Sequence, residues 1–270
     1  MSELPPLIEP QQLEPLLGRD NLLVVDLSKG TTHQQLHIPG AVFLEYELII
    51  ANRKPAYGLL PPLETLEQVL SETGIGNRTH VVAYDDEGGG KACRLLWTLD
   101  TLGHTSHSLL NGGLHAWANE HFPVEQKLTP PTPARFSGQT DTTRIADARY
   151  ILEHLDNPRL CLLDARSPQE YSGAKRFAER AGHIPGAINM EWLWAMDRER
   201  NLRLRPEAQL RSELEALGIT PDREVITYCQ THHRSSFTYF LLKLLGYPQV
   251  RGYPGSWSDW GNRSDTPVVC

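Results

Sequence analysis

The sequence predicts an α/β protein made of two similar domains, each a mainly parallel sheet flanked by helices. Two observations support this prediction. The first is an internal repeat that covers most of the chain. The second is the alternation of short apolar runs with helical periodicity, which is typical of β/α units around a parallel sheet. With 270 residues, the chain is also long enough for two domains of ordinary size.

The repeat begins where an apolar run containing Asp is followed by the segment His-Ile-Pro-Gly-Ala. In the first half, three segments come next: an apolar run that ends at an Asp, a helical pattern that closes at a Leu-Gly pair, and a Gly-rich segment. The second half has the same series, with Cys in place of that Asp. The matched segments are 22–27 and 161–166, 37–41 and 183–187, 81–85 and 225–229, 102–103 and 245–246, and 111–117 and 251–257. Because these matches keep their order and nearly their spacing, duplication explains them far better than chance.

The two halves are separated by a segment with the composition of a linker. Residues 126–145 contain Pro130-Pro131-Thr132-Pro133 and Ser137-Gly138, and proline clusters make such segments semi-rigid. We therefore expect one domain at 1–125, a linker at 126–145 and a second domain at 146–270. Ligands of parallel sheets gather beyond the carboxyl ends of the strands.

Cys229 lies at such a strand end and is the strongest candidate for chemistry. The apolar run 225–228 predicts a buried strand, 229–235 a short cationic loop, and the periodicity of 237–245 a helix. A helix N-terminus carries partial positive charge and unpaired N–H donors. A cysteine there loses its proton easily and becomes a nucleophile, and the same amides can hold an anion.

The other three cysteines have settings that do not suggest chemistry. Cys161 lies inside the apolar run 160–163, where a buried core cysteine is expected. Cys93 fits helix packing, and Cys270 is the last residue of the chain. No Cys-x-x-Cys pair indicates zinc or a disulfide framework. We expect neither a metal nor another cofactor.

The repeated Asp…His-Ile-Pro-Gly-Ala pattern, with one cysteine loop in the second half, resembles a two-domain rhodanese-type sulfurtransferase. The loop Cys229-Gln230-Thr231-His232-His233-Arg234 is similar to a bacterial variant of that family. It differs from the Cys-Arg-Lys-Gly-Val-Thr loop of thiosulfate-preferring members and the Cys-Gly-Ser/Thr-Gly-Val-Thr loop of mercaptopyruvate-preferring members. The resemblance implies two rhodanese-like domains, of which only the second is catalytic. Asp85 stands in the first half where Cys229 stands in the second.

The resemblance implies that Cys229 takes a sulfur from thiosulfate or a similar anionic donor as a persulfide. A thiophilic acceptor, such as cyanide or a thiol, then removes this sulfur, and a protein acceptor is left open. Arg234 is the candidate for holding the donor, because guanidinium offers a planar fork to an oxyanion. The alternative is a loop-closing arginine with a carboxylate partner. The remaining candidates for substrate binding are Gln230, Thr231, His232, His233, Ser235 and Arg166.

These secondary candidates have bland alternatives. Adjacent histidines on a turn point apart, so we expect only one of His232 and His233 to face the sulfur. Thr231 and Ser235 can equally serve as caps. Arg166 follows the strand that contains Asp164, and only the half with the cysteine has an arginine there. The sequence favours neither a supporting electrostatic role nor a structural role for Arg166.

Composition limits the partners. The net charge of −7 argues against broad binding of nucleic acid or membrane surfaces. No secretory signal or apolar run of about 20 residues is visible, so we expect a cytoplasmic protein with reduced thiols. We also expect a monomer. The alternatives are a cysteine-dependent phosphatase or arsenate reductase, a 3-mercaptopyruvate sulfurtransferase, and, for the first half, a binding module. The usual phosphatase loop has five residues between Cys and Arg, one more than this chain.

Overall fold

The computed structural model describes residues 4–270, which divide by their contacts into two compact units. The first unit contains the chain up to Ile49, Pro61–Thr140 and Met196–Leu204. The second unit contains Ile50–Leu60, Asp141–Ala195 and Arg205–Cys270. Each half of the sequence therefore contributes a short segment to the unit formed mainly by the other half. The predicted boundaries at 125 and 146 stay a prediction.

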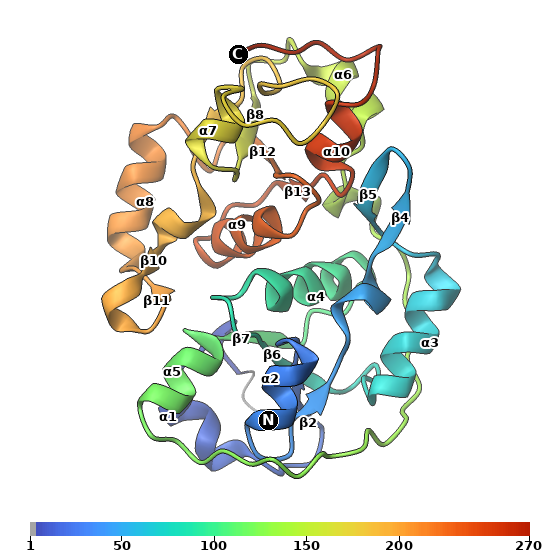
Figure 1. The fold of residues 1–270 in the computed structure, drawn as a ribbon, viewed down its shortest axis with the longest axis vertical. Coiled ribbons are helices and arrows are strands. Elements are labelled where there is room, and N and C mark those ends of the chain that lie inside the picture. The colour runs from blue at the N-terminus through green and yellow to red at the C-terminus, as the bar shows by residue number, and fades with distance from the viewer. Residues whose placement is uncertain (1–3) are drawn as a thin grey trace. The chain divides into compact units, whose positions relative to one another are not determined.

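The first unit is built on a five-stranded sheet in the order β1-β7-β6-β2-β3, with every pair parallel. Successive side chains of a strand face opposite sides, so Val24 and Val82 pack with helices α1 and α5 on one face. Helix α4 packs against β6 and β7 (Figure 1). The strands are β1 Leu7–Ile8, β2 Leu22–Asp26, β3 Val42–Phe43, β6 His80–Tyr84 and β7 His107–Leu110, with the hairpin β10 Met196–Asp197 and β11 Arg203–Leu204. The helices are α1 Pro10–Leu13, α2 Gly30–Gln35, α3 Leu63–Thr73, α4 Gly90–Thr101 and α5 Gly113–Asn119.

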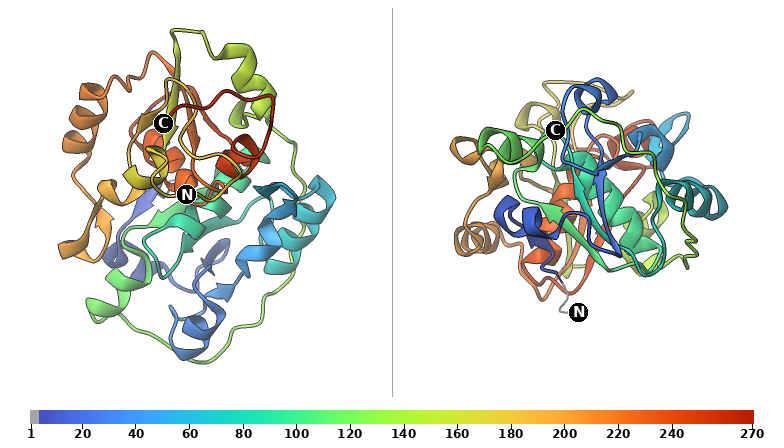
Figure 2. Two further views of the ribbon diagram at one scale, coloured as in Figure 1. Left: turned by 45° about the horizontal axis from the view of Figure 1, so that its top comes forward. Right: turned by 90° about the horizontal axis from the view of Figure 1, so that it is seen from below.

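The second unit repeats this plan with a four-stranded parallel sheet in the order β13-β12-β8-β9. Helices α6 and α10 cover one face, and α9 packs against β12 and β13. The views in Figure 2 show helices around both sheets. The strands are β8 Leu160–Asp164, β9 Ile188–Asn189, β12 Glu224–Tyr228 and β13 Val250–Gly252, with the hairpin β4 Ala51–Arg53 and β5 Ala56–Leu59. The helices are α6 Ala148–His154, α7 Pro168–Tyr171, α8 Glu207–Ala216, α9 Arg234–Leu244 and α10 Ser256–Trp260. Parallel sheets flanked by helices confirm the predicted fold class.

The repeated motif is explained by one buried hydrogen-bond pattern. In the first unit, the Tyr84 hydroxyl donates to the Asp26 carboxylate (2.7 Å) and accepts from the amide of Ile38 (3.2 Å). In the second unit, the Tyr228 hydroxyl bonds to Asp164 and accepts from the amide of Ile184 (3.3 Å). Asp and His-Ile-Pro-Gly-Ala thus recur because together they fix the strand end that precedes Asp85 or Cys229.

The structure corrects the end of the predicted repeat. The sequence pairs 111–117 with 251–257, which equates Trp117 with Trp257. In the structure, the Trp117 indole donates to the carbonyl of Pro123 (2.6 Å), and the Trp260 indole donates to that of Pro267 (2.8 Å). The true partner of Trp117 is therefore Trp260, three residues later. The glycine-rich pattern misled the comparison, because Gly112-Gly113 corresponds to Gly255-Ser256.

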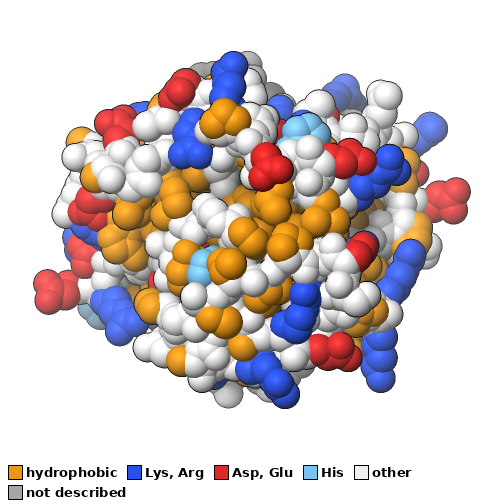
Figure 3. Space-filling model, turned by 90° about the horizontal axis from the view of Figure 1, so that it is seen from above, with side chains coloured by type: hydrophobic (Ala, Val, Ile, Leu, Met, Phe, Trp, Pro, Cys, Tyr) orange, Lys and Arg blue, Asp and Glu red, His pale blue; other side chains and the backbone are white. Residues whose placement is uncertain are grey.

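The surface carries both signs of charge. Basic and acidic side chains are interspersed around hydrophobic ones on the face shown in Figure 3, so this face is not broadly cationic. No helix within residues 4–270 is long and apolar enough to cross a membrane.

Candidate active site

Cys229 follows strand β12 directly, and helix α9 begins five residues later at Arg234. The helix begins three residues before the apolar periodicity at 237, since the polar residues of its first turn are included. The loop passes through a left-handed conformation at His232 (φ 54°). The thiol is completely buried, so any charge on the sulfur is stabilised by the protein and not by water.

Hydrogen-bond donors converge on the sulfur. Burial raises the pKa of the Cys229 thiol, and the positive charge of Arg234 lowers it. Hydrogen bonds from the Ser235 hydroxyl and from the amides of Ser235 and Thr231 lower the pKa further. The donors outweigh burial, so the pKa of Cys229 lies below its ordinary value. Burial instead raises the pKa of Cys161 to about 11 and that of Cys93 well above its ordinary value.

The first two residues of helix α10, Ser256 and Trp257, hold the loop backbone. The Ser256 hydroxyl accepts from the amides of Cys229 (3.2 Å) and His232 (3.1 Å), and donates to the carbonyl of Tyr253 (2.7 Å). The amide of Trp257 donates to the carbonyl of Cys229 (2.9 Å). These contacts direct the amides of Cys229 and His232 toward Ser256 and away from the sulfur. They also fix the directions of the other loop amides.

Arg234 is engaged by a carboxylate. Its two terminal nitrogens donate to the two oxygens of Glu170, at 2.7 and 2.8 Å. Glu170 lies in helix α7 and also forms a capping box with Ser167. Burial raises the pKa of Glu170, but Arg234 and Ser167 outweigh it and hold that pKa at about 2. This geometry favours the loop-closing alternative for Arg234, and its donor-binding role stays a prediction.

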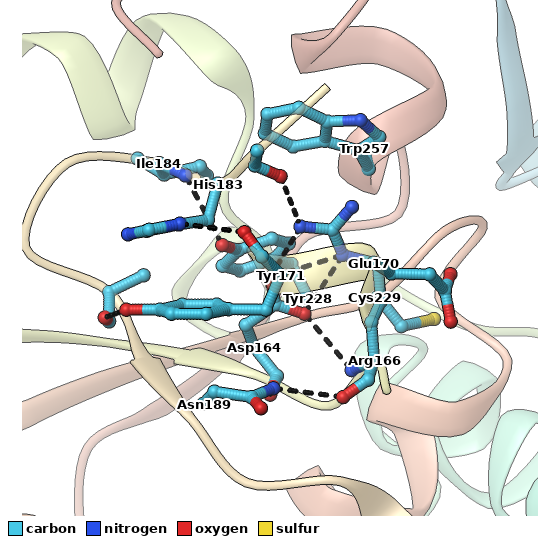
Figure 4. A network of polar contacts seen from close by, with 12 residues as sticks. Asp164, Arg166, Glu170, Tyr171, His183, Ile184, Asn189, Tyr228, Cys229 and Trp257 are labelled. Carbon is cyan, nitrogen blue, oxygen red and sulfur yellow. Dashed lines mark hydrogen bonds and ion pairs between the residues drawn. The ribbon is translucent and has the colours of Figure 1, made fainter. Parts of the chain in front are cut away.

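Arg166 lies in a separate buried network (Figure 4). Its guanidinium bonds the carboxylate of Asp164 (2.6 Å) and the carbonyl of Gly182 (2.8 Å). It also stacks on the ring of Trp257, 4.4 Å from the centroid. These contacts occupy the guanidinium and favour the structural role over substrate binding.

The other predicted residues have distinct environments. The His232 ring is buried and its Nδ1 lies 2.8 Å from the Ser235 hydroxyl. The His233 ring lies beside Trp192, with centroids 5.9 Å apart, so the two rings have different neighbours, as expected on a turn. The Gln230 amide nitrogen donates to the carbonyl of Phe177 (3.2 Å).

The β4–β5 hairpin also approaches the loop of residues 229–233. A Cβ placed on Gly58 (φ 76°) would lie only 2.1 Å from the carbonyl oxygen of Thr231. The neighbouring Tyr57 amide donates to the hydroxyl of Ser258 (2.9 Å), whose own amide donates to the carbonyl of Gln230 (3.0 Å). Residues 50–60, although encoded in the first half, therefore support the loop that carries the cysteine.

The sequence matches the rhodanese-like domain model twice, over residues 9–120 and 147–263. The chain belongs to the rhodanese-like family. Two relatives named thiosulfate sulfurtransferase, from Azotobacter vinelandii and Pseudomonas aeruginosa, are each 46% identical and cover 99% of this chain and 98% of their own length. The anaerobic ergothioneine biosynthesis enzyme of Chlorobium limicola has the same fold, with a TM-score of 0.87 at 24% identity over 97% of this chain and 69% of that one. The predicted two-domain rhodanese architecture is confirmed.

The first rhodanese-like repeat has a loop around Asp85 at the position of the Cys229 loop. The Asp85 carboxylate accepts from the amides of Glu87 (3.0 Å), Gly89 (2.7 Å) and Ala92 (2.9 Å). The amide of Leu114 donates to the carbonyl of Asp85 (3.0 Å), as that of Trp257 does to Cys229. The Asp85 carboxylate is thus hydrogen-bonded by loop amides at the position that Cys229 takes in the second repeat.

Sequence reasoning missed three residues of this rhodanese site: Gly58, Glu170 and Ser256. The Ser167-x-x-Glu170 spacing signals a helix start, but not the pairing with Arg234, which is 64 residues away. Ser256 could have been found from the corrected repeat, which aligns it with Gly113 and so shows a CH2OH side chain present only in the second half; both residues have a positive φ (53° and 49°). Among residues 4–270, no group of three or more His, Cys, Asp or Glu could hold a metal ion.

Proposed function

We propose that this protein transfers a sulfane sulfur from thiosulfate, or a similar anionic donor, to a thiophilic acceptor through a persulfide on Cys229. The observation that carries the proposal is the convergence of Arg234, Ser235 and Thr231 on one buried sulfur, which lowers the pKa of that thiol. The same two units hold Cys93 and Cys161 with raised pKa values. A lowered pKa supplies the thiolate that nucleophilic attack requires.

The reaction is a double displacement that balances without a cofactor. The Cys229 thiolate attacks the outer sulfur of thiosulfate, the bond between the two sulfurs of thiosulfate breaks, and sulfite leaves with the bonding electron pair. The persulfide anion then loses its outer sulfur to cyanide, which becomes thiocyanate, or to a thiolate, and the Cys229 thiolate is regenerated. The fixed donors stabilise negative sulfur in both half-reactions, as an oxyanion hole stabilises negative oxygen.

Thiosulfate is the proposed donor because two relatives of nearly equal length and 46% identity carry that name. Mercaptopyruvate is the poorer donor in this proposal, because the loop lacks the small Gly-Ser/Thr-Gly sequence of enzymes that prefer it. The acceptor is a small thiophile or the thiol of a protein. A compartment that keeps thiols reduced, such as the cytoplasm, suits the free cysteine, and the protein acts as a monomer.

The phosphatase alternative is disfavoured by the Arg234–Glu170 pair. A transferring phosphoryl group needs a free guanidinium and an anion-tolerant site. In this chain the guanidinium fork is bound by a carboxylate, at 2.7 and 2.8 Å.

The test is a kinetic comparison of Cys229→Ser with Cys270→Ser. We expect Cys229→Ser to abolish thiosulfate:cyanide transfer, and Cys270→Ser, which removes the exposed cysteine, to keep the full rate. Thiosulfate should exceed mercaptopyruvate in kcat/KM, and aryl phosphates should not be hydrolysed. Full transfer activity in Cys229→Ser, or Cys229-dependent phosphatase activity, would overturn the proposal.

A further inference from the structure

The contacts around His232 show a buried chain of three polar groups that ends at the catalytic sulfur. The Ser235 hydroxyl makes a hydrogen bond to Cys229. On its other side the same hydroxyl oxygen lies 2.8 Å from Nδ1 of His232. His232, Ser235 and Cys229 have no exposed surface, so water does not compete for these bonds.

The direction of the protons along this chain follows from the chemistry of the groups. A serine hydroxyl has one proton to donate and lone pairs to accept with. A thiolate only accepts, so the Ser235 proton must point at the sulfur when Cys229 is ionised. The Ser235 oxygen is then an acceptor toward His232, and Nδ1 of His232 must carry a proton. If Nδ1 had no proton, it would compete with the sulfur for the hydroxyl proton.

The backbone of His232 is fixed on both sides. Its amide donates to the Ser256 hydroxyl (3.1 Å), and its carbonyl accepts from the Ser236 hydroxyl (2.5 Å). The residue has a φ of 54°, a left-handed conformation that is uncommon for residues other than Gly, although Asn, Asp and His adopt it more often than the rest. The corresponding residue of the first unit is Gly88, also with a positive φ (100°). The second unit therefore has an imidazole ring at a position where the first unit has no side chain.

We propose that His232 is a positioning residue whose Nδ1–H holds the Ser235 hydroxyl as a donor to the Cys229 sulfur. The proposal rests on the proposed sulfur transfer, for which the thiolate and the persulfide are the states to be stabilised. It resolves which histidine of the loop acts on the sulfur, and it assigns the action to a serine-mediated contact. Ser235 is the group that touches the sulfur, and His232 acts through it.

The other charges near the sulfur are constant in the test. Arg234 in α9 lowers the pKa of Cys229 directly. Glu170 in α7 and Asp164 in β8 act on Arg234, and Asp164 is itself paired with Arg166. The variants proposed below change none of these four groups. Differences in the thiolate fraction of Cys229 among the variants therefore report the Ser235 hydroxyl and the His232 ring.

The experiment measures alkylation of Cys229 by neutral iodoacetamide as a function of pH, in a Cys270→Ser background that removes the exposed thiol. The variants are Ser235→Ala, His232→Gly, His232→Asn and the double variant His232→Gly/Ser235→Ala. Glycine accepts the positive φ without strain. Asparagine tolerates it also and keeps an N–H donor bonded to Cγ, as Nδ1 is.

We expect Ser235→Ala to slow alkylation about ten-fold at a pH below the thiol pKa, as loss of a hydrogen bond to a charged group predicts. His232→Gly should slow it several-fold, and His232→Asn should restore the rate to within about two-fold of the parent. The double variant should match Ser235→Ala to within about two-fold, because the ring acts only through the hydroxyl.

Two results would overturn the proposal. One is a double variant whose alkylation is slowed by the product of the two single effects, and the other is a His232→Asn variant as slow as His232→Gly. Thermal unfolding of each variant identifies a loss of fold. If His232→Gly does not fold, His232→Asn is compared with Ser235→Ala, and an Asn variant as slow as Ser235→Ala would overturn the proposal. Alkylation needs no sulfur donor. A parent protein that forms no persulfide with thiosulfate would therefore refute the proposed function, whereas the alkylation series decides the role of His232 separately.

Discussion

Replacing Glu170 by Gln should destabilise the second unit by an amount that depends on pH. The change keeps the size and shape of the side chain and removes the charge that binds both nitrogens of Arg234. The pKa of Glu170 is lowered from 4.5 to about 2, although burial alone would raise it, because Arg234 and Ser167 stabilise the ionised form. At about 1.4 kcal/mol for each pKa unit, this difference corresponds to about 3 kcal/mol near neutral pH.

The pH dependence has a definite sign. The folded-state pKa lies below the unfolded-state pKa, so the unfolded chain binds the proton more readily. The stabilisation is complete at pH values above 4.5 and is lost as the pH falls toward about 2. Urea unfolding should show a difference between the wild type and Glu170→Gln of about 3 kcal/mol at neutral pH, decreasing to about 2 kcal/mol at about pH 3.5. A difference that is absent, or does not change with pH, would refute the reasoning.

The same variant separates the two roles of Arg234. If Arg234 closes the loop through Glu170, Glu170→Gln should leave the KM for thiosulfate unchanged or raise it. If Arg234 binds the donor, freeing its fork should lower that KM. The contacts seen in the structure lead us to expect the first result.

Three further variants test the supports of the site. Gly58→Ala should slow sulfur transfer and cost more stability than Gly186→Ala, because both have φ near 76° but only Gly58 faces a carbonyl at 2.1 Å; equal losses would contradict this contact. Asp85→Ala should leave the rate of sulfur transfer unchanged. It should lower the free energy of unfolding by about 1–3 kcal/mol, because it leaves three amides without an acceptor. A large fall in the transfer rate with the fold intact would give the first unit a part in catalysis. Arg166→Met should cost about 3–5 kcal/mol, whereas Arg149→Met, which breaks an exposed pair, should leave the free energy of unfolding nearly unchanged. Similar losses for the two variants in urea unfolding would argue against the buried network.

The sequence was sufficient to predict the central strands and the position of the cysteine. The apolar runs at 22–27, 81–85 and 225–229 coincide with β2, β6 and β12, because residues buried on both faces of a parallel sheet form continuous apolar segments. The strand–loop–helix arrangement at Cys229 follows from the change of period after the cysteine. The low pKa of its thiol follows from that arrangement together with Arg234 and Ser235.

The supports of the loop could not be predicted in the same way, because they join distant parts of the chain. Glu170 meets Arg234 across 64 residues, and the hydroxyl of Ser258 meets Tyr57 across 201. No local periodicity records such contacts. The hairpin of residues 50–60 belongs by contact to the second unit, and its role at the loop depends on the absence of a Cβ at Gly58, which is evident only from the folded backbone.

The central claim is that Cys229 carries the transferred sulfur, and intact-mass measurement tests it most directly. After incubation with thiosulfate and removal of excess donor, the protein should gain the mass of one sulfur atom, and peptide mapping should place that sulfur on Cys229. Addition of cyanide should restore the original mass, and Cys229→Ser should show no gain at any stage. A cyanide-labile sulfur on Cys229→Ser, or a wild-type protein that gains no sulfur from thiosulfate, would contradict the account.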